Sequence, residues 1–506
     1  MKVRELLDFS QERIKTLHYT WIAFFITFYV WFNMAPLAST MLKSIGWLTK
    51  EHLKMLAISN VALTIPGRIA IGALIDRYGP RIVFSILMVV MSIPALVFAF
   101  ADTFTQLIVS RLILSVIGAG FVIGIRMVAQ WFPPKSVGFA EGFYAGWGNF
   151  GSAWAAMTLP WIALHVLGNF EDGWRYALAI NGLVSLVYGI MYYFLVRDLP
   201  EGGATKSYHF KAAKKAEPMT VSSWVDLGQY IIWSFPLIGA LGILTWRIGN
   251  IVIDKGLPTE HLLVPSSVIT SIYIALGLIF VVHVAKVLHV NVPILTKGVK
   301  KEDRYCWSSV AALNSTYFAN FGAELAIVSM LPMFFERTFS ISPTLAGMIA
   351  ASFAFVNLIA RPLGGWISDR MNSRKRTMLF YMLGICIGFV LMGFIGKYGL
   401  DGAIVPRFDG TWWLIVAVII TITCSMFVQG AEGATFAIIP MIKKNMTGQI
   451  AGMAGAYGNV GAVVYLVVYS MVDDKVFFNC IAAGACISFV YCLIFLREPK
   501  GAFADE

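Results

Sequence analysis

Two arginines within apolar segments are the residues of this chain whose chemistry is most specific. Arg68 lies in the segment 62–72 and Arg361 in the segment 356–365. A charged side chain at the centre of a membrane helix costs roughly 2.5–3.5 kcal/mol on the insertion scale. Guanidinium is planar, always charged and forked, so it can donate to two oxygens at once. Two such groups at matching places predict a buried site for an anion.

The residues that follow each arginine repeat in the same order. A glycine comes four positions later, an Asp-Arg pair eight positions later, and a further arginine five positions after that aspartate. The two sets are Gly72, Asp76, Arg77 and Arg81, and Gly365, Asp369, Arg370 and Arg374. At 1.5 Å per residue, Arg68 and Arg361 each lie about 12 Å along the helix from the aspartate that follows. This places them near the middle of a ~30 Å hydrocarbon core.

The composition is that of a membrane protein. The chain has 506 residues, of which 58% are hydrophobic and only 13% charged, against about 25% charged in soluble domains. Continuous apolar runs of about 20 residues recur, and each is long enough to span a bilayer. Because the runs do not alternate with polar residues, they predict helices and not barrel strands. We expect about fourteen spans, and therefore an all-α polytopic membrane protein.

The net charge of +11 does not indicate nucleic-acid binding, because the basic residues are confined to alternate loops. This is the positive-inside pattern, and it predicts a multi-pass protein of the cytoplasmic membrane with both termini in the cytoplasm. Residues 1–19 are polar and basic, and no small-residue cleavage site follows them, so the first apolar run is read as a retained span.

The order of apolar and basic segments predicts two bundles separated by an insert. The expected parts are a cytoplasmic N-terminus (1–19), an N-terminal six-helix bundle (20–197), a central insert with two extra helices and basic cytoplasmic loops (198–306), a C-terminal six-helix bundle (307–497) and a cytoplasmic C-terminus (498–506). An insert of two helices returns the chain to the same side, so the second bundle keeps the topology of the first.

The two bundles also repeat in sequence. The fifth span of the first contains Gly-Asn-Phe-Gly around Asn149, and the fifth span of the second contains Gly-Asn-Val-Gly around Asn459. Two parallel six-helix repeats are the architecture of major facilitator transporters, which bind substrate near the midplane between the repeats. The segment 72–81 closely resembles that superfamily's loop motif, and 365–374 resembles a degenerate copy. The motif residues are Gly72, Asp76, Arg77, Arg81, Asp369 and Arg370. Arg111 resembles part of another motif of the superfamily, with an architectural or coupling role.

The segments 140–151 and 454–461 resemble the two signatures of the nitrate/nitrite porter family within that superfamily. The resemblance covers about 20–200 and 305–497, and the central insert is similar to that of the longer, cyanobacterial-type members. It implies that an arginine in the second helix of each half binds the anion, beside signature asparagines and aromatic rings. The implied residues are Arg68, Arg361, Asn149, Asn459, Tyr317, Phe321 and, on a weaker alignment, Phe121.

Each of these residues also has a simpler interpretation. An arginine can form a structural ion pair, for which Glu432 could serve Arg361. Small residues can serve only to pack helices closely, and aromatic rings can contact lipid or core. An asparagine at the same place in both signatures favours a polar contact, because a buried amide is unfavourable unless it is hydrogen-bonded.

The sequence therefore predicts a secondary transporter that imports nitrate and nitrite by alternating access, acts as a monomer in the lipid bilayer and is coupled to protons. Glu324 and Glu432 are the intramembrane carboxylates that could carry the coupling. A nitrate/nitrite exchanger, a transporter of another small anion and, remotely, a membrane receptor or sensor stay open as alternatives. We expect no enzyme activity, cofactor, metal site or nucleic-acid partner, because no nucleophile–base pair, metal-ligand spacing or nucleotide loop is present.

Overall fold

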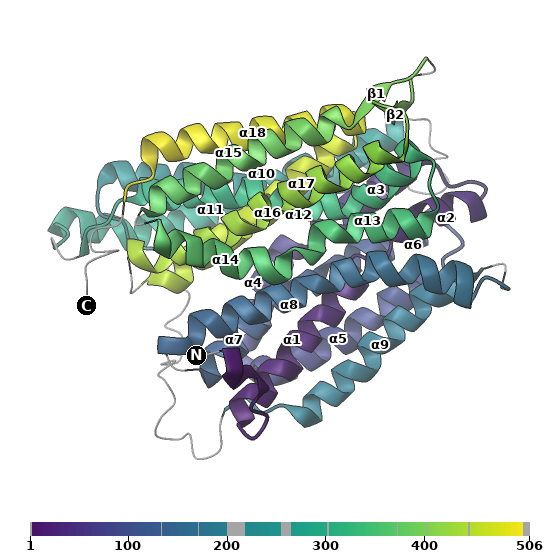
Figure 1. The fold of residues 1–506 in the computed structure, drawn as a ribbon. Coiled ribbons are helices and arrows are strands. Elements are labelled where there is room, and N and C mark those ends of the chain that lie inside the picture. The colour runs from purple at the N-terminus through teal and green to yellow at the C-terminus, as the bar shows by residue number, and fades with distance from the viewer. Residues whose placement is uncertain are drawn as a thin grey trace. The chain divides into compact units, whose positions relative to one another are not determined.

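The computed structural model describes residues 3–132, 134–170, 172–199, 218–254, 265–300, 303–371, 373–400, 402–443 and 446–498 (Figure 1). Long helices make up most of it. Thirteen helical segments of this described part are long and apolar enough to cross a membrane, and α8, Pro134–Trp161, covers the remaining predicted span. The prediction of an all-α polytopic membrane protein is confirmed.

The N-terminal half runs from a short 3-10 turn to the helix before the insert. Its elements are η1 Val3–Leu7, α1 Glu12–Trp31, η2 Ala35–Leu37, α2 Ala38–Ser44, α3 Lys50–Ala62, α4 Thr64–Tyr78, α5 Pro80–Ala99, α6 Phe104–Leu114, η3 Ser115–Ala119, α7 Gly120–Trp131, α8, the π-helical turn η4 Ile162–Val166 and α9 Gly173–Leu195.

Two helices occupy the insert, and the C-terminal half follows. The elements are α10 Trp224–Asp254, α11 Ser266–Lys297, α12 Trp307–Phe339, α13 Pro343–Phe355, α14 Asn357–Arg370, α15 Arg374–Phe394, β1 Gly396–Tyr398, β2 Ile404–Pro406, α16 Thr411–Ile442, α17 Thr447–Tyr469 and α18 Asp474–Phe495. The antiparallel pair β1–β2 was not expected from the sequence. It forms where Gly402, at a positive φ of 77°, lets the chain reverse between α15 and α16.

The helices pack into two compact units. The first comprises Met1–Lys214 with Ile327–Pro362, and the second Lys215–Ala326 with Leu363–Glu506. The first unit thus includes the second part of α12, all of α13 and the start of α14. There α13 packs along α8 through an alanine cluster, whose members are Ala153, Ala156, Ala351 and Ala354. Small side chains let these two helices approach closely, as in other membrane interfaces.

The first membrane helix is interrupted between α1 and η2, and a buried arginine holds the interruption. Arg111 donates from Nη2 to the carbonyl of Trp31 at 2.7 Å and from Nη1 to Oδ1 of Asn33 at 2.8 Å. Asn33 in turn donates to Asn181 on α9. The carbonyl exposed by the break is therefore satisfied inside the protein, as the hydrocarbon environment requires. This agrees with the architectural interpretation of Arg111.

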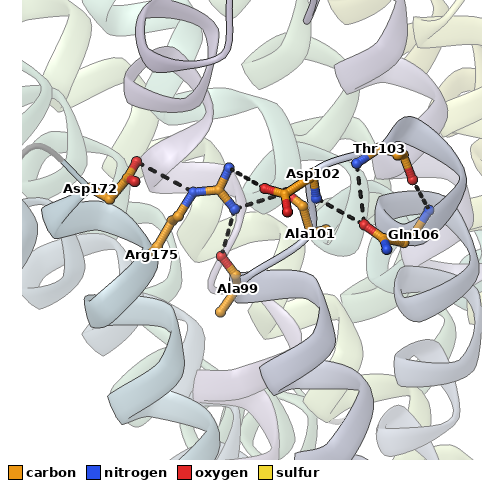
Figure 2. A network of polar contacts seen from close by, with 7 residues as sticks. All are labelled: Ala99, Ala101, Asp102, Thr103, Gln106, Asp172 and Arg175. Carbon is orange, nitrogen blue, oxygen red and sulfur yellow. Dashed lines mark hydrogen bonds and ion pairs between the residues drawn. The ribbon is translucent and has the colours of Figure 1, made fainter.

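A second polar network ties α5, α6 and α9 together at one end of the first unit (Figure 2). Arg175 at the start of α9 donates to the carbonyls of Ala99, the last residue of α5, and Ala101, two residues beyond it. Its guanidinium also pairs with Asp102 at 3.7 Å and Asp172 at 3.3 Å. Beside it, Thr103 and Gln106 cap α6 reciprocally. The network satisfies helix ends that would otherwise leave backbone groups unpaired.

In the second unit the insert is fastened to the signature helix α17. Arg247 on α10 donates to Oγ and to the carbonyl of Ser470, the residue that caps α17, at 2.7 and 2.8 Å. Near the middle of α17, the Tyr457 hydroxyl donates to the carbonyl of Trp233, and their rings lie 5.3 Å apart. Helix α10 is thus fixed along much of α17, while α11 exposes nearly its whole length.

Candidate functional site

Arg68 and Arg361, the two arginines within apolar segments, each lie five residues after a break in the helix. The break between α3 and α4 falls at Leu63, and the break between α13 and α14 falls at Val356. At the first, the Leu63 N–H donates to the Ser115 hydroxyl at 3.0 Å, besides a contact with the Val61 carbonyl of its own helix. A helix that restarts inside a membrane directs unpaired N–H groups and a positive dipole end inward. Transporters use such broken helices for anionic substrate groups.

Arg68 meets an aromatic ring of its own half. Its guanidinium carbon lies 5.5 Å from the centroid of the Phe121 ring on α7. Phe121 packs against Phe24 of α1 and Tyr144 of α8, at centroid distances of 5.6 and 6.4 Å. The Tyr144 hydroxyl donates to the Gly120 carbonyl. The structure therefore brings Arg68 and Phe121 together, both of them partly buried.

Arg361 is buried, with 6% of its surface exposed, and its helix begins against the helix that carries Asn149. The backbone oxygen of Asn357, the first residue of α14, lies 3.3 Å from where a Cβ on Gly146 would stand. Gly146 lies three residues, or about one turn, before Asn149 on α8. The Asn149 side chain is 1% exposed, and neither of its amide atoms has a hydrogen-bond partner among the described residues.

The second unit holds the other predicted residues. Tyr317 and Phe321 on α12 are buried and stacked, with centroids 5.1 Å apart. Both rings lie over Gly458 of α17, where an added Cβ would stand 2.5 Å from Phe321 and 2.8 Å from Tyr317. The next residue, Asn459, donates to the Gly455 carbonyl at 3.0 Å, while its Oδ1 has no partner in the described part of the chain. The C-terminal signature thus positions two aromatic rings and an amide together.

The signature glycines fix the register between the two halves. A Cβ on Gly148 would overlap the Phe24 ring, as one on Gly458 would overlap Phe321. A Cβ on Gly151 would strike the Phe25 carbonyl, and one on Gly461 the Phe318 carbonyl. Phe25 and Phe318 are 293 positions apart, as are Arg68 and Arg361. The first two helices of the halves are therefore equivalent residue by residue.

Glu324 on α12 and Glu432 on α16 are buried within the second unit, with 2% and 0% of their surfaces exposed. Their placement away from water agrees with the expectation of intramembrane carboxylates. A coupling role for either one stays a prediction.

In each half, an arginine of the loop motif donates its backbone N–H to a carboxylate that follows the sixth helix, and we call this contact the latch. The sequence predicted the motif but not the carboxylate. The Arg81 N–H donates to Asp198 at 2.8 Å, and the Arg374 N–H donates to Glu498 at 2.7 Å. Each carboxylate follows the sixth helix of its half and caps the helix that begins beside the motif. Burial raises the pKa of the Asp198 carboxyl, although its bond from Arg81 acts in the opposite direction.

The other motif residues contribute less to this latch. The Arg81 guanidinium lies over the Tyr193 ring at 4.2 Å, Arg77 lies over Tyr78 at 5.2 Å, and Gly72 borders open space. The side chains of Asp76, Asp369 and Arg370 lie outside the described part of the chain. The sequence signal that could have found the two capping acids is their shared place, directly after the sixth span of each half.

Comparison with known proteins agrees with this geometry. The model of the Major Facilitator Superfamily matches residues 20–296 and 313–504. The chain is 42% identical to the nitrate/nitrite transporter NrtP of Picosynechococcus sp., over 97% of this chain and 94% of that one. It is 43% identical to NrtP of Nostoc punctiforme, over 99% and 96%. A high-affinity nitrate transporter of rice is 26% identical over 91% of this chain and 72% of its own.

Solved structures support the fold. A D-xylose–proton symporter matches with a TM-score of 0.62 at 13% identity, over 97% of this chain and 99% of that one. The xylose transporter XylE from E. coli, in a partially occluded inward-open state, matches with a TM-score of 0.60 at 13% identity, over 96% and 100%. At such identities the likeness concerns the fold alone. The relatives are transporters and not enzymes, as the sequence predicted. This chain belongs to the nitrate/nitrite porter family of the Major Facilitator Superfamily.

Proposed function

We propose that this protein imports nitrate and nitrite across the cytoplasmic membrane by alternating access, as a monomer with both termini in the cytoplasm. The observation that carries the proposal is the pair of arginines, each placed five residues after a break in a membrane helix and at the same register in both halves. The full-length similarity to nitrate/nitrite transporters supports the choice of anion.

The chemistry of the residues suits a small planar anion. Nitrate carries one negative charge over three weakly basic oxygens, and the forked guanidinium of Arg68 or Arg361 can donate to two of them at once. Aromatic ring edges are electropositive and can flank a flat anion, which is the role we assign to Phe121, Tyr317 and Phe321. Asn149 and Asn459 have amide atoms without partners in the described residues, and these can complete the oxygen contacts.

We further propose that uptake is coupled to protons through Glu324 or Glu432. Importing an anion against an inside-negative potential is unfavourable by about 2.3 kcal/mol per charge per 100 mV. More than one proton carried with each nitrate would make the cycle electropositive, so that the same potential would drive uptake. Both carboxylates are buried in membrane helices, where ionisable groups usually have a functional role.

Uptake of labelled nitrate by proteoliposomes that contain the purified protein tests the proposal. We expect saturable uptake that nitrite competes with, that rises as the external pH falls and that collapses when a protonophore is added. Uptake that ignores pH and protonophore but requires nitrite inside would identify an exchanger instead. Nitrate binding without any uptake would favour the sensor interpretation and contradict transport.

A further inference from the structure

One face of α12 carries two polar side chains at positions where the equivalent face of α1 carries tryptophan. The register set by the signature glycines pairs four positions on these two helices. On α1 they are Trp21, Phe24, Phe28 and Trp31, and on α12 they are Asn314, Tyr317, Phe321 and Glu324. The spacing of three and four residues places each set of four on one helix face. The C-terminal half therefore places an amide, Asn314, and a carboxylate, Glu324, on either side of the aromatic pair, where the N-terminal half has Trp21 and Trp31.

Asn314 is the residue of this α12 face that has no role in the proposed function. It is fully buried, and neither its amide nitrogen nor its amide oxygen has a hydrogen-bond partner in the described part of the chain. Leaving a buried polar group unsatisfied costs about 1–3 kcal/mol. In the equivalent position of α1, the Trp21 indole donates to His18 at 2.9 Å. The unsatisfied amide is therefore particular to the C-terminal half.

The remaining contacts of α12 show that Asn314 does not face the neighbouring helix α18. That helix is met by the other side of α12: the Ser315 hydroxyl donates to Ser488 at 2.9 Å, and Ser308 donates to the Phe495 carbonyl at 3.4 Å. At 100° per residue, Asn314 is displaced about 60° around the helix from Tyr317 and about 20° from Phe321. It shares the face that carries the aromatic pair, about 4.5 Å closer to the start of α12.

We propose that Asn314 binds the transported oxyanion at a second position, one turn beyond Tyr317 toward the start of α12. This inference rests on the proposed function, since the ligand is the same anion. With the N-terminus in the cytoplasm, the start of α12 is its cytoplasmic end, so Asn314 contacts the anion on the inner part of its path. The amide NH₂ donates to an anion oxygen without adding charge. An uncharged donor binds the anion less tightly than a guanidinium does, so the anion can still be released.

The competing explanation is that Asn314 is only a packing residue, and the two explanations predict different results for Asn314→Leu. Leucine fills a similar volume and removes the unsatisfied amide. If the amide only packs, the protein should gain stability with nitrate binding unchanged. If the amide binds the anion, nitrate affinity should fall whatever happens to stability.

The experiment measures nitrate-induced thermal stabilisation of the detergent-purified protein and nitrate exchange in proteoliposomes, for wild type, Asn314→Leu, Asn314→Asp and the control Ser315→Ala. A lost hydrogen bond to a charged ligand predicts a fall in nitrate affinity of about tenfold for Asn314→Leu. Asn314→Asp keeps the shape but places a carboxylate beside the anion, so we expect a larger loss at neutral pH. Ser315→Ala, which faces α18, should keep wild-type affinity.

Wild-type affinity and exchange in both Asn314 variants would overturn the inference. If Asn314→Leu does not fold, Asn314→Asp decides alone, because its volume matches that of asparagine. A different result would contradict the proposed function itself, namely a wild-type protein that shows neither nitrate-induced stabilisation nor nitrate uptake.

Discussion

The aligned faces of α1 and α12 separate what the two halves share from what only one of them has. Both halves place an aromatic residue over a signature glycine, Phe24 over Gly148 and Phe321 over Gly458. Three residues after Phe28 and Phe321 the two helices diverge. The first half has Trp31, whose indole donates to the Asn60 carbonyl at 2.6 Å. The second has the carboxylate of Glu324.

This difference suggests separate roles for the two halves in anion binding and in proton coupling. Residues that a symmetric site needs, namely the arginines and signature asparagines, occur in both. Among the described residues, the two glutamates that are almost fully buried, Glu324 and Glu432, lie in the C-terminal half. If either of them carries the proton coupling, the titrating group belongs to the C-terminal half, while the proposed anion binding draws on both.

The largest effect is expected from the residues that the halves share. Lysine at position 68 or 361 keeps the charge and loses the planar fork. Each of the variants Arg68→Lys and Arg361→Lys should lower nitrate uptake by about tenfold or more, because hydrogen bonds to a charged ligand are lost. Initial uptake rates in proteoliposomes, normalised to reconstituted protein, measure this. Near-normal rates in both variants would mean that only the charge matters.

A smaller effect is expected at the signature glycine of the C-terminal half. Gly458→Ala places a methyl group 2.5 Å from Phe321 and 2.8 Å from Tyr317, so the stacked rings must shift. Overpacking of this kind costs about 1–3 kcal/mol, and we expect KM for nitrate to rise about fivefold. Gly452→Ala is the matched control, since nothing lies within 4 Å of its added Cβ. Equal KM values in the two variants would contradict the role given to the aromatic pair.

Much of this site could be predicted from the sequence, because it repeats. The arginine register, the signature asparagines and the apolar spans are local patterns, and each occurs twice. The breaks at Leu63 and Val356 could not be located, since neither residue type signals a turn. Pro66 lacks the N–H that would bond to the Ala62 carbonyl and contributes to the first break. The capping acids lie 117 and 124 residues from the backbone they cap, and only the packed fold brings them there.

Glutamine at position 324 keeps the size and shape of the glutamate side chain but cannot gain or lose the carboxyl proton. Glu324→Gln should flatten the rise of uptake at low external pH while leaving nitrate exchange active. Glu336→Gln is the matched control on the same helix, because Glu336 pairs with Lys43 at 3.5 Å and not with the anion. Initial rates of nitrate uptake measured as a function of external pH test this. An unchanged pH profile in Glu324→Gln, followed by a flat one in Glu432→Gln, would move the coupling group to α16.

The smallest effect is expected at the two latches, where the halves are most alike. Asp198→Asn and Glu498→Gln keep an acceptor oxygen but remove the charge that favours the N-terminus of α5 or α15. Such interactions contribute about 0.3–1 kcal/mol when they are exposed, and Glu498 is exposed whereas Asp198 is half-buried. We therefore expect Tm to fall by a few degrees at most, and more for Asp198→Asn, with KM for nitrate unchanged. A change in KM without a change in Tm would instead place the latch in the transport cycle. A cap that only stabilises its helix cannot alter affinity at a site about 15 Å further along the membrane span.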